Sequence, residues 1–295
     1  MTLATDLCFW LARNRIRKRR LGDAGYTQHS FDTGAYRQWR MQALRQQFCG
    51  FFSAQDVIGK HVVDFGCGTG ELSRLAAEMG ASSVTGVELA RELYEQAVRL
   101  ASEMPAGVRP SFILAEDETR IPLPTQSADV ILCFDVLEHV MAYKEIIREW
   151  RRVLRPQGRV LIWWVPWWHP YGPHIESLVP VPWAHVFFSD RTLIETCARV
   201  YDSPDFQPRI WDLDTAGQKR PNKWRSMQVL PGVNRLTMRR FEKLCGQTGL
   251  KIESRRLVGF RSSSLARLTW FFLRVPYLRE FFTATAVYVL RNPEN

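Results

Sequence analysis

The sequence contains no stretch of about 20 consecutive apolar residues, the length that a helix needs to cross a bilayer, so we expect no membrane-spanning segment. The apolar residues around Phe9 and Trp10 are too few for the core of a signal peptide, and the arginines follow them instead of preceding them. No internal repeat or low-complexity tract is visible. We therefore expect a folded cytoplasmic protein.

Disulfide frameworks and zinc sites are missing as well. The six cysteines are scattered, without a Cys-x-x-Cys pair or a Cys/His cluster at zinc spacing. Cys67 lies within a glycine-rich turn and Cys133 within an apolar run, so both are expected to be small buried residues. This cysteine usage is typical of a reducing compartment.

The net charge of +10 is concentrated at the two ends of the chain. Residues 1–20 carry +5 and residues 235–295 carry +8, whereas residues 21–234 carry −3. A basic end can meet lipid headgroups, nucleic acid or an anionic substrate. The basic character therefore does not surround the middle of the chain, where the motifs described below lie.

The basic N-terminal segment is expected to form a helix over residues 3–20. One side of that helix would carry four apolar side chains: Leu3, Leu7, Trp10 and Leu11. Two interpretations stay open. The helix can make peripheral contact with an anionic membrane through residues 1–20, or it can be a surface helix with a solvated basic end.

From His61 onward, short apolar runs alternate with segments of helical periodicity. The runs are HVVDF, SSVTGVEL, SFILAED, ADVILCFD and RVLIWWV, and the helical segments between them include ELSRLAAEMG, RELYEQAVRLASEM and YKEIIREWRRVL. Strands that alternate with helices predict a parallel sheet with right-handed crossovers. Two later runs, LKIESRRLVGF and TATAVYVLRN, are expected to close the sheet.

A turn with three glycines follows the first of these strands. The strand ends at Asp64, the turn carries Gly66, Gly68 and Gly70, and a helix begins near Glu71. Such a turn at the carboxyl edge of a parallel sheet lets a nucleotide-like ligand approach the backbone. The third glycine comes one position too early for a dinucleotide fingerprint, and a carboxylate at the helix start repels a pyrophosphate. The pattern instead suits a ligand with an ammonium group and no phosphate.

Acidic residues follow the next two strands at useful distances. Glu88 comes 24 positions after Asp64, close to the spacing of an acidic ribose ligand, and Leu89 follows it. After SFIL, Asp117 is our preferred acceptor for an adenine amino group, with Glu116 as the alternative and Glu118 beside them. Each of these acids taken alone is also compatible with a solvated loop.

The strand ADVILCF ends near Phe134 and Asp135, and a helix is expected to open with Glu138 and His139. Backbone carbonyls at this strand end can meet the ammonium group of the ligand, which would place His139 at the reacting centre. On one helical face, Asp135, Glu138 and His139 would also be spaced to hold a divalent metal. We expect no metal, and capping of the helix by Asp135 is the competing interpretation.

With these motifs the sequence resembles the class I S-adenosylmethionine (SAM)-dependent methyltransferases, in particular the type 11 small-molecule group, over about residues 62–168 and the two late strands. The resemblance implies a Rossmann-like α/β fold with a seven-stranded sheet, mostly parallel with a reversed last strand, and helices on both faces. It implies SAM as cofactor, with S-adenosylhomocysteine as product. The implied cofactor contacts are Asp64, Gly66, Gly68, Gly70, Glu88, Leu89, Asp117, Glu118 and Phe134.

The acceptor side is expected in the Pro-, Trp- and His-rich segment after Val165, which lacks clear periodicity. An aromatic wall suits a planar or lipophilic acceptor. The candidate acceptor-binding residues are Tyr26, Trp167, Trp168, His169, Tyr171, His174 and Trp183. If the acceptor is a hydroxyl, a base helps to remove its proton, and His139 is the first candidate and His174 the second.

We therefore predict a methyltransferase that modifies the oxygen or carbon of a small lipophilic or aromatic metabolite. A nucleic-acid methyltransferase is one alternative, although the −3 charge of the middle and the lack of a base-flipping motif count against it. A non-catalytic SAM-binding module is another. Four regions are expected: 1–50 with basic and lid helices, 51–165 with the cofactor core, 166–240 with the acceptor pocket, and 241–295 completing the sheet.

Overall fold

The computed structural model describes residues 2–19, 34–208, 212–214, 216–230, 232–260 and 270–294. These residues divide into two compact units. Unit 1 comprises residues 1–37 and 167–233, and unit 2 comprises residues 38–166 and 234–295. Tyr26, one of the expected acceptor residues, lies outside the described residues.

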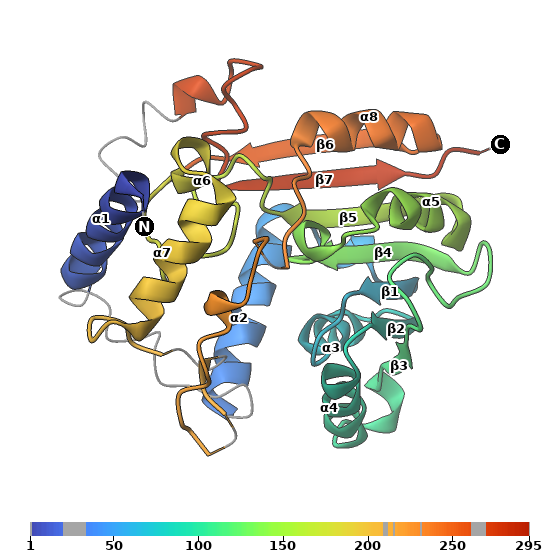
Figure 1. The fold of residues 1–295 in the computed structure, drawn as a ribbon. Coiled ribbons are helices and arrows are strands. Elements are labelled where there is room, and N and C mark those ends of the chain that lie inside the picture. The colour runs from blue at the N-terminus through green and yellow to red at the C-terminus, as the bar shows by residue number, and fades with distance from the viewer. Residues whose placement is uncertain are drawn as a thin grey trace. The chain divides into compact units, whose positions relative to one another are not determined.

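Unit 2 contains a seven-stranded sheet with the order β3-β2-β1-β4-β5-β7-β6 (Figure 1). Its strands are β1 (His61–Phe65), β2 (Ser83–Glu88), β3 (Ser111–Leu114), β4 (Ala128–Phe134), β5 (Leu154–Trp164), β6 (Lys251–Val258) and β7 (Thr285–Arg291). The pairs from β3 to β5 are parallel, and β7 runs antiparallel to both β5 and β6. The predicted mostly parallel sheet with a reversed last strand is confirmed.

Each central strand is buried on both faces, because its successive side chains enter two different cores. Val62 and Leu132 belong to one core, whereas Val63 and Ile131 belong to the other. Helices α2 (Gly34–Phe51) and α3 (Glu71–Glu78) contribute to the first core. Helices α5 (Tyr143–Val153) and α8 (Met238–Thr248) contribute to the second, and α4 (Arg91–Ser102) contacts β2 and β3.

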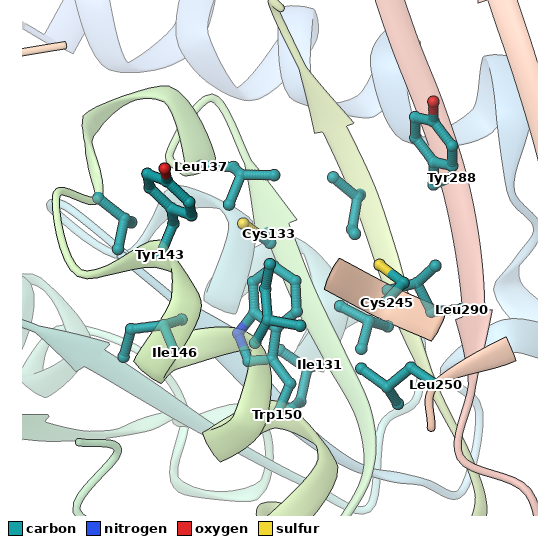
Figure 2. Close-up of a cluster of buried hydrophobic side chains, with 14 of the residues drawn as sticks. Ile131, Cys133, Leu137, Tyr143, Ile146, Trp150, Cys245, Leu250, Tyr288 and Leu290 are labelled. Carbon is teal, nitrogen blue, oxygen red and sulfur yellow. The ribbon is translucent and has the colours of Figure 1, made fainter. Parts of the chain in front are cut away.

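The core beneath α5 is centred on Trp150, whose side chain is fully buried (Figure 2). Its ring lies among Ile131 and Cys133 of β4 and meets Phe65 of β1 edge-on, with the ring centroids 6.1 Å apart. Since Phe65 also borders the cavity described below, this packing fixes one wall of the candidate site. All six cysteines are free; Cys67 and Cys133 are buried as predicted.

Unit 1 contains α1 (Leu3–Arg19), α6 (Ala184–Phe187) and α7 (Asp190–Asp202). Thr5, Cys8 and Ala12 form the buried side of α1, which packs against α7. Of the apolar side chains expected on one side of this helix, Leu3, Leu7 and Trp10 are exposed at 90, 52 and 60%, and Leu11 is half-buried. None of the described helices combines the length and the apolarity that crossing a membrane requires.

Candidate cofactor site

In the turn after β1, the backbone packs tightly against a side chain at one glycine and borders open space at another. Gly66 and Gly68 have φ angles of 70° and 56°, in the left-handed region that favours glycine. A Cβ atom at Gly66 would lie 2.5 Å from Cγ1 of Val136, whereas a Cβ atom at Gly68 would meet nothing within 4 Å. Gly66 is therefore needed for packing, and the backbone at Gly68 borders space that a ligand can approach.

The carboxylate of Glu88, at the end of β2, is held by backbone N–H groups. One oxygen accepts a hydrogen bond from Gly68 N–H at 2.8 Å, and the other accepts from Leu89 and Ala90 at 2.8 and 2.9 Å. These bonds join the glycine turn to the neighbouring strand end. Glu88 is only 9% exposed, and it is one of the residues that line the cavity described below.

Asp64 has a different environment from Glu88. Its carboxylate is 2% exposed and accepts a hydrogen bond of 2.6 Å from the hydroxyl of Ser73 on α3. Burial raises the pKa of Asp64 to about 7, and the hydrogen bond from Ser73 opposes that rise. Asp64 is not among the residues that line the cavity, and its hydrogen bond joins the end of β1 to α3.

A cavity of about 190 Å³ opens at the carboxyl ends of β1, β2 and β3. Its apolar wall is formed by Phe65, Val87, Ala115, Val136, Val140 and Ile146. Its polar lining includes Glu88, Asp117, Glu118, Arg120 and His139. An apolar slot with a few converging polar groups is the usual form of a small-molecule site, and the carboxyl edge of the sheet is its usual place.

Asp117 is exposed and begins a tight turn at the edge of the cavity. Its Oδ1 atom accepts hydrogen bonds from the backbone N–H and the hydroxyl of Thr119 at 2.7 and 2.6 Å. These bonds hold the pKa of Asp117 below its usual value. The side chain is therefore an ionised acceptor in a fixed orientation.

The loop that carries His139 is a 3-10 helix, Leu137–His139, instead of the expected α-helix opening. Asn234 fixes this loop: its side-chain amide donates to the carbonyls of Leu137 and Val140, both at 2.7 Å, and its backbone N–H donates to the carbonyl of Glu138 at 2.7 Å. His139 is thereby held at the cavity wall, among the predicted cofactor residues.

The helical spacing proposed for Asp135, Glu138 and His139 is wrong. Asp135 lies before the 3-10 helix with a φ of 56°, and its Oδ2 atom accepts two hydrogen bonds of 3.2 Å from Arg40 of α2. Glu138 is buried, and burial together with the nearby Asp135 raises its pKa to about 8. The three side chains do not share one helical face, so the spacing argument for a metal no longer applies.

Unit 1 holds the aromatic residues expected at the acceptor pocket. The ring of His185 meets Trp167 edge-on and stacks on Trp168, with centroid distances of 5.0 and 6.1 Å. Nδ1 of His169 accepts a hydrogen bond from Tyr171 N–H at 3.0 Å, and burial lowers the pKa of His169 to about 3. This imidazole is therefore neutral at physiological pH.

Two further acceptor candidates, His174 and Trp183, have left-handed backbones with φ of 54° and 56°. Trp183 N–H donates to the carbonyl of Pro170 at 2.7 Å, and His174 N–H donates to that of Tyr171 at 2.9 Å. The aromatic segment is thus an ordered series of turns. Acceptor binding by these residues stays a prediction.

The structure brings most of the expected cofactor residues to one cavity: Gly66, Glu88, Leu89, Asp117 and Glu118, together with His139. Phe134 differs, because its side chain is 4% exposed and packs against Phe48 and Phe52 in the core. Gly70 is required for packing, since a Cβ atom there would lie 2.7 Å from the ring of Phe112. Any ligand contact of Phe134 or Gly70 would have to use the backbone.

Three residues of this region were not anticipated: Arg40, Arg120 and Asn234. Arg40 and Asn234 act across long sequence separations, on Asp135 and on the loop of His139. Nothing in their local sequence marks them, because their partners are defined only by the folded chain. Arg120 was detectable in principle, since it lies three positions after Asp117 at the same strand end.

Residues 63–162 match the family model of a methyltransferase domain. Two solved structures share the fold. The [4+2]-cyclase SpnF has a TM-score of 0.52 and 15% identity, and the match covers 97% of this chain and 94% of that one. The PH0226 protein from Pyrococcus horikoshii OT3 has a TM-score of 0.51 and 17% identity, and the match covers 94% of this chain and 99% of that one. The fold is that of the Rossmann-like methyltransferases, and the resemblance to class I SAM-dependent methyltransferases is confirmed over the α/β core.

Two relatives with an assigned activity are similar to part of the chain. A ubiquinone biosynthesis O-methyltransferase from Idiomarina loihiensis is 37% identical over 106 residues, which are 35% of this chain and 42% of that protein. The protein of the same name from Xanthomonas oryzae pv. oryzae is 35% identical over 123 residues, 41% of this chain and 50% of that protein. The chain thus spans half or less of the length of these relatives.

Proposed function

We propose that the protein is a SAM-dependent methyltransferase that methylates an oxygen atom of a small lipophilic or aromatic acceptor. The observation that carries the proposal is the Glu88 carboxylate, which is fixed to Gly68 N–H at the edge of an apolar cavity. A carboxylate in this position can accept hydrogen bonds from both hydroxyls of a ribose. The name of the matched relatives favours oxygen over carbon as the methyl acceptor.

The residues of the cavity fit the nucleoside part of SAM. The apolar side chains of Phe65, Val87 and Ala115 provide a slot for a flat base, and the ionised Asp117 can accept from an adenine amino group. Gly68 leaves room beside its backbone for the ammonium group, and an ammonium group bound near the buried Asp64 would favour the ionised form of that carboxyl. No phosphate-binding feature is needed for this ligand.

The chemistry places modest demands on the protein. The bound cofactor supplies a methyl group on a sulfonium, which is its own activated leaving group. The chain contributes alignment of the acceptor and exclusion of water. At the cavity wall, an imidazole nitrogen of His139 can accept the proton that a hydroxyl acceptor loses.

Transfer of a labelled methyl group tests the activity. Purified protein is incubated with methyl-labelled SAM and a lipid or metabolite extract of the source organism, and the products are separated by polarity. We expect label in a lipophilic product and none after incubation with Gly68→Arg protein. Label confined to nucleic acid in the extract would contradict a small-molecule acceptor.

We further propose that α1 contacts a membrane surface where the acceptor resides. Leu3, Leu7 and Trp10 are 90, 52 and 60% exposed, while the opposite side of the helix is buried against α7. The helix is oriented by an ion pair of Asp6 with Arg199 and by a hydrogen bond from Thr5 to Glu195. These contacts present the apolar side outward.

Sedimentation with anionic liposomes tests this contact. The variant Leu7→Ser/Trp10→Ser should bind liposomes less tightly than the unchanged protein. The variant Val98→Ser, which removes an exposed apolar side chain from α4, serves as the matched control. Equal sedimentation of all three proteins would remove the role of α1.

A further inference from the structure

The segment that precedes β7 exposes aromatic side chains at unusual density. Trp270, Phe271 and Tyr277 are 56, 58 and 83% exposed, and Leu278 is 39% exposed. We call residues 270–278 the aromatic loop. Large apolar side chains that gather on a surface mark a contact with a partner or a membrane, whereas single ones carry no such meaning.

The aromatic loop is held by contacts with other residues of unit 2. Phe272 stacks on Phe282 with the ring centroids 4.6 Å apart, and Arg279 forms an ion pair of 3.3 Å with Glu242 of α8. The hydroxyl of Thr283 donates to the Arg279 carbonyl at 2.6 Å. These contacts hold the segment in place and leave Trp270, Phe271 and Tyr277 exposed.

The aromatic loop and the residue that follows it carry basic charge. Residues 270–279 contain Arg274 and Arg279 and no aspartate or glutamate, and Arg279 is the one paired with Glu242. The guanidinium of Arg274 lies over the ring of Trp270, 3.7 Å from the centroid, so a cation is held directly beside an exposed aromatic ring. A surface of this kind complements an anionic, partly apolar partner.

We propose that the aromatic loop inserts into the surface of an anionic lipid bilayer. Trp and Tyr favour the interface between headgroups and acyl chains, where their rings are buried and their polar atoms remain hydrated. The arginines are attracted by the negative surface potential. This inference goes beyond the proposed function, because membrane contact of unit 2 requires no methyl transfer and SAM binding can be measured separately.

A second copy of the chain fits this surface less well. In a two-fold symmetric contact each copy offers the same patch, so Arg274 of one copy would face a basic patch of the other, and the nearby Glu242 is already paired with Arg255 and Arg279. Single-stranded nucleic acid would meet both the charge and the rings by stacking. Nucleic acid would not place the rings in an apolar phase, as a bilayer would. An experiment that detects insertion of the rings into lipid therefore distinguishes a bilayer from nucleic acid.

The experiment uses full-length protein with Leu7→Ser/Trp10→Ser, so that α1 does not contribute. Its partition onto vesicles of phosphatidylglycerol and phosphatidylcholine is compared with that of further variants. Phe271→Ser and Tyr277→Ser should each weaken binding about tenfold, and Arg274→Gln about fivefold. The conservative changes Trp270→Phe and Tyr277→Phe should retain most of the binding, and Val98→Ser is the control for an exposed apolar side chain elsewhere.

Insertion is measured with brominated lipids, which quench tryptophan within the bilayer. The protein should lose a quenchable component of its fluorescence when Trp270 is changed to Phe, although vesicle binding persists. The inference would be overturned if the protein did not bind vesicles, or if Phe271→Ser left vesicle binding unchanged. Equal quenching of the fluorescence with and without Trp270 would also overturn it. Binding of single-stranded nucleic acid without vesicle binding would assign the loop to that partner instead. Unchanged melting temperatures exclude unfolding as the cause of any loss.

Discussion

Glu88 and Gly68 are joined by a hydrogen bond of 2.8 Å that spans the gap between the first two strands of the sheet. The donor belongs to the glycine turn after β1 and the acceptor to the last residue of β2. Because Leu89 and Ala90 donate to the other oxygen, the carboxylate is fixed before any ligand arrives. Such preorganisation removes part of the entropy cost of ligand binding.

Glu88→Gln should weaken SAM binding about 10- to 100-fold. The NH2 group of the glutamine is a hydrogen-bond donor. It would face either Gly68 N–H or the N–H groups of Leu89 and Ala90, which are donors as well, so at least one hydrogen bond is lost. A lost hydrogen bond to a charged group costs about 1.5–3 kcal/mol. Titration calorimetry measures the change, with the exposed Glu92→Gln of α4 as a matched control. An affinity equal to that of the control would remove Glu88 from the site.

Asp64 should make the stability of the protein pH-dependent. Its pKa is raised from 3.8 in the unfolded chain to about 7 in the folded protein, chiefly by burial. Between these pH values the folded protein keeps a proton that the unfolded chain has released, so the free energy of unfolding falls as the pH rises. Asp64→Asn removes this contribution and keeps an acceptor for Ser73.

Urea denaturation of both proteins at a series of pH values measures that contribution. The difference in unfolding free energy between the Asn variant and the unchanged protein should grow in favour of the variant from about pH 4 to about pH 7. Below that window the difference should be constant. A constant difference over the whole range would show that Asp64 is ionised in the folded state.

His139→Ala should lower turnover about 10²- to 10⁴-fold, the usual contribution of a general base, while SAM still binds. His139 lines the cavity, and its loop is held by Asn234 through backbone carbonyls that the substitution leaves in place. The control is His61→Ala at the surface, where Nδ1 of the imidazole forms a hydrogen bond of 2.7 Å with the hydroxyl of Ser83 on β2. Turnover as fast as that of the control would mean that the acceptor needs no base from this residue.

Arg40→Met should destabilise the protein by about 1–3 kcal/mol, because it leaves the half-buried Asp135 without its cation. Adding Asp135→Asn should recover part of the loss. Arg45→Met, on the same helix but in a more exposed ion pair with Glu78, should change stability by no more than about 0.5 kcal/mol. Equal losses for the two arginine variants would show that the pair of Arg40 contributes nothing beyond surface charge.

Much of the sheet was predictable because its signal is local. The run ending at Asp64 is apolar on both faces and is followed by a glycine turn, so strand, turn and helix could be placed from residues 61–78 alone. Residues 166–235 were different. The sequence SDRTLIETCARV contains a helix start at Ser189, whose side chain caps Thr192 N–H, but the surrounding Pro and Trp residues concealed the helix α7.

The interior of the candidate site was less predictable, because it depends on contacts between distant parts of the chain. Asp135 takes a left-handed backbone and turns to Arg40, 95 positions away, so an α-helical spacing could not describe it. The prediction for Phe134 concerned the backbone carbonyls at the strand end, and it stays a prediction; the side chain packs in the core with Phe48, as the alternation of β4 requires. The residues at the strand ends line one cavity because backbone direction alone decides their position, and their contact with a cofactor stays a prediction.

Binding of SAM at the corner between Gly68 and Glu88 is tested most directly by titration calorimetry of the unchanged protein and of Gly68→Arg. The matched control is Gly59→Arg: both glycines have positive φ angles and open space beside them, but only Gly68 donates a hydrogen bond to Glu88, which lines the cavity. We predict that the unchanged protein and Gly59→Arg bind SAM and that Gly68→Arg does not. Retained affinity in folded Gly68→Arg protein would contradict the assignment of the site.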